Sequence, residues 1–421
     1  MKQLKDIFGR KTSIWLSLSI ILVTIALWWA FDPLIVNTYV MRLPVGYDLD
    51  RIVKLEVASS VVVREIGSDN IVPTDDWFHD SEEQQMLSRV QELPEVEQAY
   101  RATSSPLGFG MVGSNSWFYQ DADSVLGWKF GFRPDSRMFE VYGMRSLTPD
   151  VPTSELTHDC NQDESIILTR SFALAVFGTI DVAGRLLRSQ KQDYSSDKIT
   201  WVDTWYRVRA VVEDVRYAPY DRDMNIVFTC TSGDGDCAPI VLRLREDCDA
   251  HRFISEREGE LQHDLITEHR YIRSAVSARD AFDLSIRQTR LGRQMRHGLL
   301  IATFFAINLA FGVFGTLLMY TRQRREEAGI RRAFGATKWS VFCGIIREVW
   351  LLTTISVTVG CAIYFQFASA HGLYELQGHN PSVHLWFDDF GTHFLLVSAV
   401  VYLIILCTVL IGTAIPAWRI H

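Results

Sequence analysis

A charged segment at residues 322–338 lies between two long apolar stretches of the chain. It reads RQRREEAGIRRAFGATK and carries six basic and two acidic side chains. Such a segment cannot lie in hydrocarbon, so it must join two membrane helices outside the bilayer. Its excess of basic residues places it on the cytoplasmic side. The sequence therefore predicts a membrane protein whose topology can be counted from this segment.

Four apolar stretches are long enough to cross a membrane as helices. The first has 18 residues without a charge, which span roughly 27 Å as a helix. Counting from the cytoplasmic segment, both ends of the chain lie in the cytoplasm. The predicted parts are 1–13 (cytoplasmic), 14–31 (crossing 1), 32–285 (exported domain), 286–321 (stalk and crossing 2), 322–339 (cytoplasmic hairpin), 340–367 (crossing 3), 368–391 (exported loop), 392–417 (crossing 4) and 418–421 (cytoplasmic).

A cleavable signal peptide is the alternative for the first apolar stretch, because it also has a basic start and an apolar core. The stretch ends in the sequence WWAFDP at residues 28–33, which contains no small-x-small cleavage site. The tryptophan pair is typical of the aromatic belt at a membrane interface. We therefore expect a retained helix with its N-terminus in the cytoplasm.

The stretch 32–285 contains no segment that is apolar enough to cross, and its patterns are those of an α+β domain. Alternation with β-branched residues predicts strands at 51–63 and 205–215, and a helical period predicts a helix at 81–96. A β-rich inserted subdomain is expected at about 105–205, where glycine, proline and aromatic residues are frequent. The aromatic residues are expected to form ordinary core, with a groove for an apolar ligand as the alternative.

Four cysteines lie in the predicted exported domain, where disulfides can form. Cys230 and Cys237 bracket a turn-rich sequence between two short predicted strands, 226–230 and 240–244. We expect these strands to form a hairpin that a Cys230–Cys237 disulfide closes, which would leave Cys160 and Cys248 as a second pair. Four cysteines allow three pairings, so the sequence alone does not exclude the others.

The second crossing has two regular features. Arg287, Arg290, Arg293 and Arg296 recur every three residues before it, which favours a solvated helix with some contact to lipid phosphates. Small residues repeat within it at a spacing that lets a second membrane helix approach closely. These predicted helix-packing residues are Ala302, Ala306, Ala310, Gly312 and Gly315.

The exported loop at 368–391 contains several side chains that can bind metals. They are His371, His379, His384, Asp388 and Asp389. Their spacing matches no known ligand pattern, so a solvated loop is the favoured interpretation and no metal site is predicted.

The sequence RREEAGIRRAFGAT at residues 324–337 closely resembles the cytoplasmic signature of the FtsX/MacB-type ABC transporter permeases, with Ala328 where isoleucine is usual. Weaker similarities follow in the family's order at 93–96, 165–185 and 206–214, although Ala210 replaces a glycine. The resemblance implies four transmembrane helices and a MacB-like periplasmic core domain between the first two.

In this family the cytoplasmic segment is a coupling helix that sits in a groove of an ATPase subunit. The residues that the resemblance assigns to ATPase coupling are Glu326, Glu327, Gly329, Ile330, Arg331, Arg332, Ala333, Phe334, Gly335 and Ala336. The residue pattern is also that of a short amphipathic helix, because Glu327 and Arg331, like Ile330 and Phe334, are four positions apart. The alternative is that the segment only anchors the hairpin in anionic lipid.

The chain has no Gly-x-x-x-x-Gly-Lys-[Ser/Thr] loop, so we expect a non-catalytic subunit that binds no cofactor itself. The resemblance implies that ATP and Mg²⁺ bind to a separate cytoplasmic ATPase. It also implies a second permease chain, identical or paralogous, in the inner membrane, and allows a periplasmic adaptor. No basic face suggests nucleic acid as a partner.

The resemblance further implies mechanotransmission, in which ATP hydrolysis moves the periplasmic domain. The expected substrates are antibiotics, peptides or lipoproteins. The alternative from another class is a membrane-anchored sensor, scaffold or regulator of a cell-wall enzyme. Its weaknesses are the lack of a cytoplasmic output domain and the three crossings that follow the exported domain. The exported domain also shows no nucleophile elbow or zinc-binding helix, which disfavours an enzyme.

Overall fold

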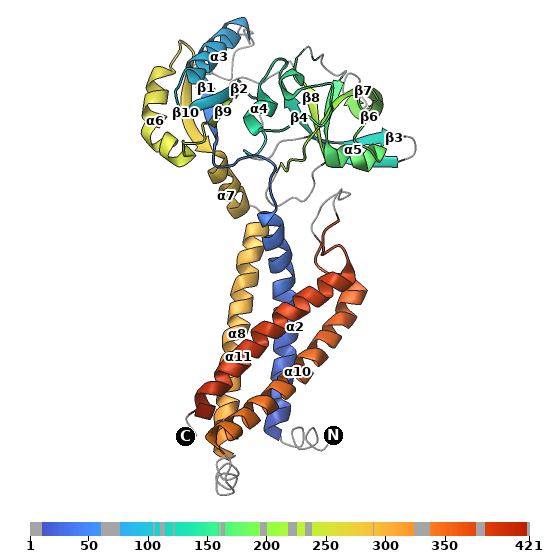
Figure 1. Ribbon diagram of the computed structural model, residues 1–421, viewed down its shortest axis with the longest axis vertical. Helices are drawn as coiled ribbons and strands as arrows, with labels where there is room; N and C mark the ends of the chain where they lie inside the picture. The colour runs from blue at the N-terminus through green and yellow to red at the C-terminus, as the bar shows by residue number, and fades with distance from the viewer. Residues whose placement is uncertain are drawn as a thin grey trace, which may run out of the picture. The chain divides into compact units, whose positions relative to one another are not determined.

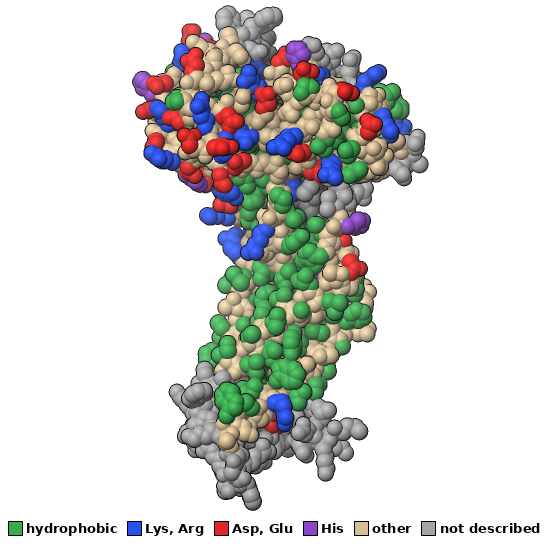
Figure 2. Space-filling view, viewed as in Figure 1, with side chains coloured by type: hydrophobic (Ala, Val, Ile, Leu, Met, Phe, Trp, Pro, Cys, Tyr) green, Lys and Arg blue, Asp and Glu red, His purple; other side chains and the backbone are tan. Residues whose placement is uncertain are grey.

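The computed structural model describes residues 11–59, 76–103, 106–109, 114–120, 123–158, 160, 165–193, 200–217, 225–231, 238–288, 290–323, 337–375 and 384–418. The chain forms two compact units. The membrane unit comprises Met1–Met41, Arg290–Leu376 and His384–His421, and the α+β unit comprises Arg42–Thr289 and Gln377–Val383. Apolar side chains cover the membrane helices, whereas acidic and basic side chains are dense on the α+β unit (Figure 2).

The membrane unit consists of four long helices in its described residues (Figure 1). They are α2 (Lys11–Arg42), α8 (Arg290–Gln323), α10 (Lys338–His371) and α11 (Phe390–Trp418). Each contains a stretch that is long and apolar enough to cross a membrane. The four predicted crossings, one before and three after an α+β domain, are thus confirmed.

Helix α2 does not end at Phe31, where the sequence predicts the end of the first crossing. It continues through Pro33 to Arg42, and its apolar span is Ile14–Arg42. Proline normally disrupts a helix because it lacks a backbone N–H group. Inside a helical bundle, neighbouring helices provide the contacts that make such a residue tolerable.

Trp28 of α2 lies at the centre of the membrane unit and is fully buried. Its ring stacks on Tyr364 of α10, with centroids 4.2 Å apart, and on Phe394 of α11, at 5.2 Å. Its indole N–H donates a hydrogen bond to the Ser398 hydroxyl at 3.0 Å. Trp28 therefore joins three helices, and it belongs to the packed core rather than to an interfacial belt.

The first part of the α+β unit is a four-stranded antiparallel sheet. Its order is β10-β1-β9-β2, with β1 at Ile52–Ser59, β2 at Val96–Arg101, β9 at Ile240–Leu244 and β10 at Arg270–Ser277. Helices α3 (Asp76–Gln91) and α6 (Ala250–Asp264) pack on this sheet, and α7 (Ala278–Gln288) follows β10 directly. The strand predicted at 51–63 and the helix predicted at 81–96 correspond to β1 and α3.

The second part of the α+β unit is a closed β-barrel with the order β3-β4-β8-β5-β7-β6. The strands are β3 (Ser114–Gln120), β4 (Asp123–Phe132), β5 (Ser165–Thr169), β6 (Leu186–Asp193), β7 (Thr200–Val212) and β8 (Ile226–Cys230). Helix α5 (Arg170–Phe177) ends at Gly178, whose φ of 69° suits a glycine. The barrel extends past the predicted boundary near residue 205, because β7 and β8 complete it.

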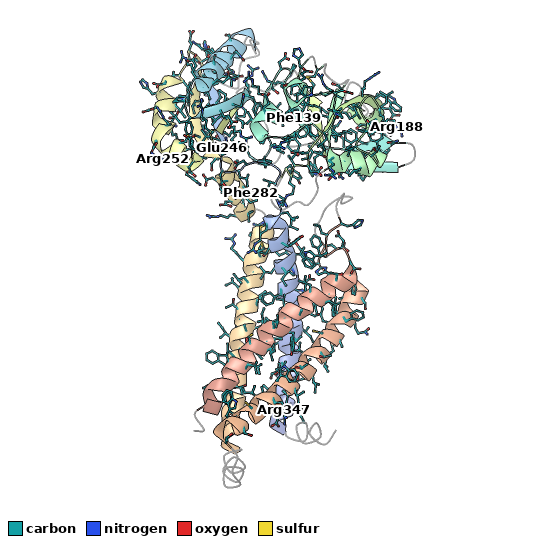
Figure 3. All side chains as sticks on the ribbon, viewed as in Figure 1. Phe139, Arg188, Glu246, Arg252, Phe282 and Arg347 are labelled. Carbon is teal, nitrogen blue, oxygen red and sulfur yellow. A yellow bond between two sulfur atoms is a disulfide. The ribbon has the colours of Figure 1, made fainter. Side chains whose placement is uncertain are left out.

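Buried aromatic side chains connect the barrel and the sheet. Phe132, Phe139 and Tyr142 belong to one cluster with residues of the barrel and the sheet, and Phe139 points into it (Figure 3). Phe139, on the short helix α4 (Met138–Tyr142), packs edge-on against Phe228 of β8, with centroids 5.1 Å apart. The expectation that most aromatic residues of this region are core is confirmed.

The predicted hairpin of 226–230 with 240–244 is wrong. Strand β8 pairs with β4 and β5 in the barrel, whereas β9 pairs with β1 and β2 in the sheet. The predicted Cys230–Cys237 disulfide is also wrong, because Cys230 is bonded to Cys160 with the Cα atoms 6.2 Å apart. Cys237 lies outside the described residues, and Cys248 is a free thiol. The prediction used only the turn residues between Cys230 and Cys237. Cys160 lies 70 positions before Cys230 in the sequence, and only the fold brings it to the end of β8.

Candidate functional site

The predicted coupling segment joins α8 to α10. Helix α8 ends at Gln323 and α10 begins at Lys338, and residues 324–336 between them lie outside the described residues. This gap contains Glu326, Glu327, Gly329, Ile330, Arg331, Arg332, Ala333, Phe334, Gly335 and Ala336. Their assignment to ATPase coupling therefore stays a prediction.

The described residues after this segment have the features of a helix start at a membrane surface. The Thr337 hydroxyl accepts a hydrogen bond from the Ser340 N–H at 3.3 Å, which caps α10. Trp339 is exposed and stacks on Phe342, as is common for tryptophan at an interface. Arg347, in the first part of α10, is also exposed (Figure 3). The cap makes α10 a separate helix that begins after the charged segment.

The predicted small-residue stripe of α8 divides into two parts. Ala302 is buried in the core of the membrane unit, and Ala306 and Ala310 are half-buried. A Cβ atom added to Gly312 or Gly315 would meet no heavy atom within 4 Å. The role of these two glycines in helix packing is thus not seen within one chain and stays a prediction.

Close helix approach occurs instead at two glycines that sequence reasoning missed. A Cβ at Gly360 of α10 would lie 2.8 Å from the Thr24 Cβ of α2, and one at Gly298 of α8 would lie 3.3 Å from the Ala30 carbonyl oxygen. Small residues allow this approach in membranes. Gly298 lies four positions before Ala302 and so extends the predicted repeat, which was read as starting only at Ala302, whereas Gly360 belongs to no predicted repeat.

A buried carboxylate and imidazole join two membrane helices. The side chains of Asp32 in α2 and His393 in α11 are 4% and 1% exposed, and Asp32 Oδ1 lies 2.6 Å from His393 Nε2. Asp32 Oδ2 accepts a hydrogen bond from the Tyr374 N–H at 3.0 Å. His393 Nδ1 lies 3.1 Å from the Phe387 carbonyl oxygen, which orients the ring so that Nε2 faces Asp32.

Sequence reasoning placed Asp32 just outside the first crossing and His393 within the fourth without connecting them. They are 361 positions apart, so no spacing pattern relates them. The available signal was a titratable side chain at each of two apolar segments. Such residues are costly in a membrane and usually have a partner or a function.

A cleft of about 360 Å³ lies beside Asp32 in the membrane unit. Helix α2 contributes Trp29, Asp32 and Pro33, α8 contributes His297 and Ile301, and the end of α10 and the residues after it complete the wall. The cleft has the size of a small-molecule site. Its walls are mostly aromatic and aliphatic, which suits an apolar ligand.

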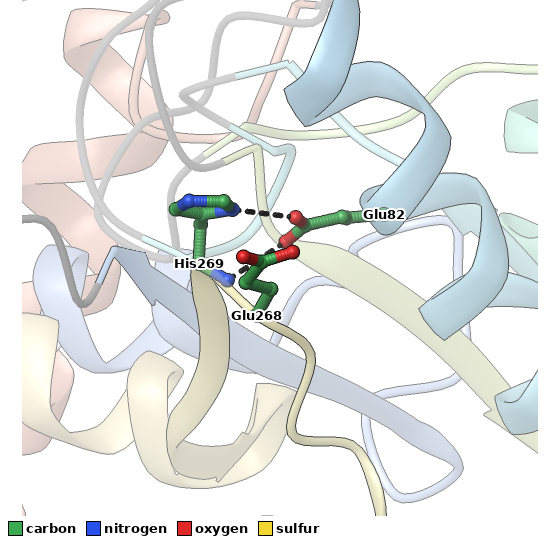
Figure 4. A group of neighbouring side chains, drawn as sticks. All are labelled: Glu82, Glu268 and His269. Carbon is green, nitrogen blue, oxygen red and sulfur yellow. Dashed lines mark hydrogen bonds and ion pairs between the residues drawn. The ribbon is translucent and has the colours of Figure 1, made fainter.

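One group in the α+β unit has the side chains of a metal site. Oxygen and nitrogen atoms of Glu82, Glu268 and His269 lie within 4.8 Å of one another (Figure 4). Both oxygens of Glu82 are already used, because Oε1 bonds the His269 ring at 2.8 Å and Oε2 accepts from the Thr267 hydroxyl at 2.6 Å. Burial raises the pKa of Glu82, but the hydrogen bonds from Thr267 and His269 outweigh it, and the pKa is lowered. Glu82 thus fastens the turn before β10 to α3.

The acidic residues of the exported loop also have structural roles. Asp389 Oδ2 accepts hydrogen bonds from the Thr392 N–H and hydroxyl, which caps α11. Asp388 Oδ2 accepts one from the Leu385 N–H. His379 lies outside the described residues. The contacts of Asp388 and Asp389 are those of a helix start.

The C-terminal part of the chain resembles a known protein family. Residues 299–420 match the family model described as FtsX-like permease C-terminal. No curated protein sequence matches the chain. The matched range contains α10, α11, most of α8 and the charged segment.

Three solved structures are similar to the chain. The periplasmic region of MacB from Actinobacillus actinomycetemcomitans is 12% identical, over 60% of this chain and 99% of that one, with a TM-score of 0.31. A domain of a putative permease protein from Porphyromonas gingivalis is 15% identical, over 55% and 92%, with a TM-score of 0.30. The extracellular domain of the noncanonic ABC-type transporter YknZ from Gram-positive bacteria is 9% identical, over 52% and 100%, with a TM-score of 0.28. No conclusion about function is drawn at these scores.

The range that the family model matches contains the last two membrane helices and most of the helix before them. The match begins at residue 299, within α8, and ends at residue 420, beyond α11. It includes the sequence at 324–337 on which the resemblance was based. The chain is a multi-pass membrane protein, and its residues 299–420 match the FtsX-like permease C-terminal domain.

Proposed function

We propose that this chain is a permease subunit that transmits the energy of ATP hydrolysis from a separate cytoplasmic ATPase to its α+β unit. The observation that carries this proposal is the position of the charged segment. It lies inside the FtsX-like domain, between two helices that each have 34 residues. The segment would sit in a groove of the ATPase through the ten residues from Glu326 to Ala336 named above.

Helix α8 is suited to carry a movement across the membrane. Its 34 residues correspond to about 51 Å at 1.5 Å per residue. One end adjoins the charged segment at Gln323, and the other begins at Arg290. Only Thr289, outside the described residues, separates α8 from the last residue of α7, Gln288, in the α+β unit. A displacement of the segment would thus reach the α+β unit through one continuous helix.

A second permease chain is proposed as the partner of α8. One side of this helix exposes three large apolar side chains, those of Leu300, Phe304 and Phe311, by 68%, 62% and 73%. Contact with lipid alone would be enough to cover these three side chains. Asn308 is also exposed, and among the described residues its amide is bonded within its own helix, to the Phe304 carbonyl oxygen at 2.8 Å. A polar residue on the outer side of a membrane helix favours contact with another helix over contact with lipid.

The proposed complex places the chain in the inner membrane with the α+β unit on the periplasmic side. ATP and Mg²⁺ would bind to the ATPase and no cofactor to this chain. Antibiotics, peptides or lipoproteins are the proposed substrates, handled outside the membrane, with a periplasmic adaptor as a further partner. The large folded domain between α2 and α8 supports work at that location.

The test is recovery of the ATPase with tagged full-length protein. Glu327→Lys and Gly335→Trp should each lower the recovered ATPase by about tenfold, because they reverse a charge or add bulk in the docking helix. Glu375→Lys is the matched control, since Glu375 is exposed in the loop after α10 and far along the chain from the segment.

Two results would contradict the proposal. One is that no ATPase accompanies the unaltered protein. The other is that the two coupling variants recover as much ATPase, and support as much transport, as Glu375→Lys does. Either result would favour the alternative of a membrane-anchored sensor or scaffold.

A further inference from the structure

The cleft beside Asp32 has an apolar wall and a polar mouth. Tyr364, Phe367 and Leu373 provide the wall, and Ile301 of α8 faces the same space. Tyr364 is 7% exposed and rigidly held by its stacking on Trp28, whereas Phe367 is 49% exposed. The wall is therefore preformed at its inner end and open toward the surroundings at its outer end.

The mouth of the cleft is rich in hydrogen-bond donors. Trp29, Gln294 and His297 line it, and no hydrogen bond joins their side chains to any described residue. His371 also lines it and is held by stacking on Phe367, at 4.5 Å between centroids. Its Nδ1 lies 3.2 Å from the Phe367 carbonyl oxygen, so Nε2 is the nitrogen that remains for a ligand.

The one acidic side chain of the cleft is already occupied. Asp32 Oδ1 bonds His393 and Oδ2 accepts from the Tyr374 N–H, so this carboxylate has its partners without a ligand. Arg293 is exposed one helical turn before His297, on the same side of α8. The groups left for a ligand are thus donors and a cation, which complement phosphate and ester oxygens.

The position of the cleft selects among phosphate compounds. Its lining residues on α8 and α10 belong to the beginning of the α8 apolar span, Gly292–Gly312, and to the end of the α10 span, Phe342–His371, while those on α2 lie within the longer span Ile14–Arg42. The ends of apolar spans lie at the border of hydrocarbon and headgroups. There a ligand with an apolar chain and a phosphate can satisfy both parts of the cleft at once.

We propose that this cleft binds one anionic phospholipid, with an acyl chain against Tyr364 and Phe367 and its phosphate at Gln294, His297 and His371. The cleft volume of about 360 Å³ suits one chain, because pockets of 300–1,000 Å³ enclose drug-sized ligands. The bound lipid would hold α2, α8 and the end of α10 together on this side of the membrane. This inference concerns the membrane unit alone and does not depend on an ATPase.

The experiment is native mass spectrometry of the purified full-length protein after exchange into micelles with dioleoyl phosphatidylglycerol or dioleoyl phosphatidylcholine. We expect the anionic lipid to be retained about fivefold more, because phosphatidylcholine carries the same phosphate together with a quaternary ammonium group, which the exposed Arg293 disfavours. The double variant His297→Glu/His371→Glu should lose this preference. His384→Glu is the matched control, because His384 is exposed and does not line the cleft.

Two further probes separate the lipid from its phosphate. Dihexanoyl phosphatidylglycerol should be retained less than the dioleoyl form, and glycerol 1-phosphate should not compete with it. Leu373→Trp, which fills the apolar wall, should lower retention while an unchanged melting temperature shows that the protein is folded. Equal retention of both lipids, full retention by the double variant, or equal competition by glycerol phosphate would each overturn the proposal.

Discussion

Two carboxylate pairs, one in each unit of the molecule, lie in opposite surroundings. In the membrane unit Asp32 and His393 form a buried pair, with side chains 4% and 1% exposed. In the α+β unit the Asp50–Arg279 pair is bidentate, with both distances 2.8 Å, but its side chains are 61% and 41% exposed. Both pairs lie within hydrogen-bond distance, whereas their surroundings differ.

This contrast follows from the solvent. Water competes for an exposed pair, so such a pair contributes little to stability. In an apolar surrounding, loss of one partner leaves the other without compensation, and this is costly. Loss of the Asp32–His393 contact is therefore expected to destabilise the membrane unit strongly, whereas loss of the Asp50–Arg279 pair should matter little in the α+β unit.

The largest effect is expected from Asp32→Ala. It leaves the His393 ring and the Tyr374 N–H without their acceptor inside the membrane unit, and the cost is about 3–5 kcal/mol. The measurement is unfolding of the purified protein in detergent. Asp389→Ala is the matched control, because it removes an exposed helix cap that is worth about 1 kcal/mol. Equal destabilisation by both variants would show that the burial of the Asp32 contacts does not set their contribution to stability.

An intermediate effect is expected from Gly360→Ala in α10. The added methyl group would lie 2.8 Å from the Thr24 Cβ atom of α2, and such overpacking costs about 1–3 kcal/mol. Gly344→Ala, in the same helix, adds its methyl group where no heavy atom lies within 4 Å. The same unfolding assay should show Gly344→Ala near the unaltered protein. If the two variants unfold alike, α2 and α10 do not approach closely at Gly360.

The smallest effect is expected from Asp50→Asn in the α+β unit. Hydrogen bonds from Arg279 lower the pKa of Asp50. The stabilisation is therefore present above the ordinary pKa of an aspartate and is lost as the pH falls through the lowered value. The variant should be less stable by no more than about 1 kcal/mol at neutral pH, because the pair is exposed.

Pulse proteolysis of the α+β unit in the full-length protein measures this difference. The stabilities of Asp50→Asn and the unaltered protein should converge in acid, and Arg279→Gln should have the same effect as Asp50→Asn. A loss of several kcal/mol at neutral pH would show that an exposed pair can matter as much as the buried one.

Features that depend on neighbours in sequence were predicted well. The four apolar spans, strand β1 and helix α3 follow from composition and periodicity over a few residues. The end of α2 was missed because Asp32 and Pro33 are ordinary stop signals, and contacts from Tyr374 and His393 override them. The predicted hairpin of β8 with β9 was wrong for a related reason. It was inferred from the turn residues between the two strands, whereas each strand pairs with strands that are far away in the sequence.

The sequence by itself determined how many times the chain crosses the membrane, where the folded domain is inserted and which segment is charged, because these depend on the transfer of consecutive residues from water to hydrocarbon. Only the tertiary structure decided that Cys160 pairs with Cys230, that Asp32 meets His393, and that a cleft opens beside them. These contacts join residues far apart in the chain. Their energy depends on the surroundings that all the elements create together, and no short pattern records it.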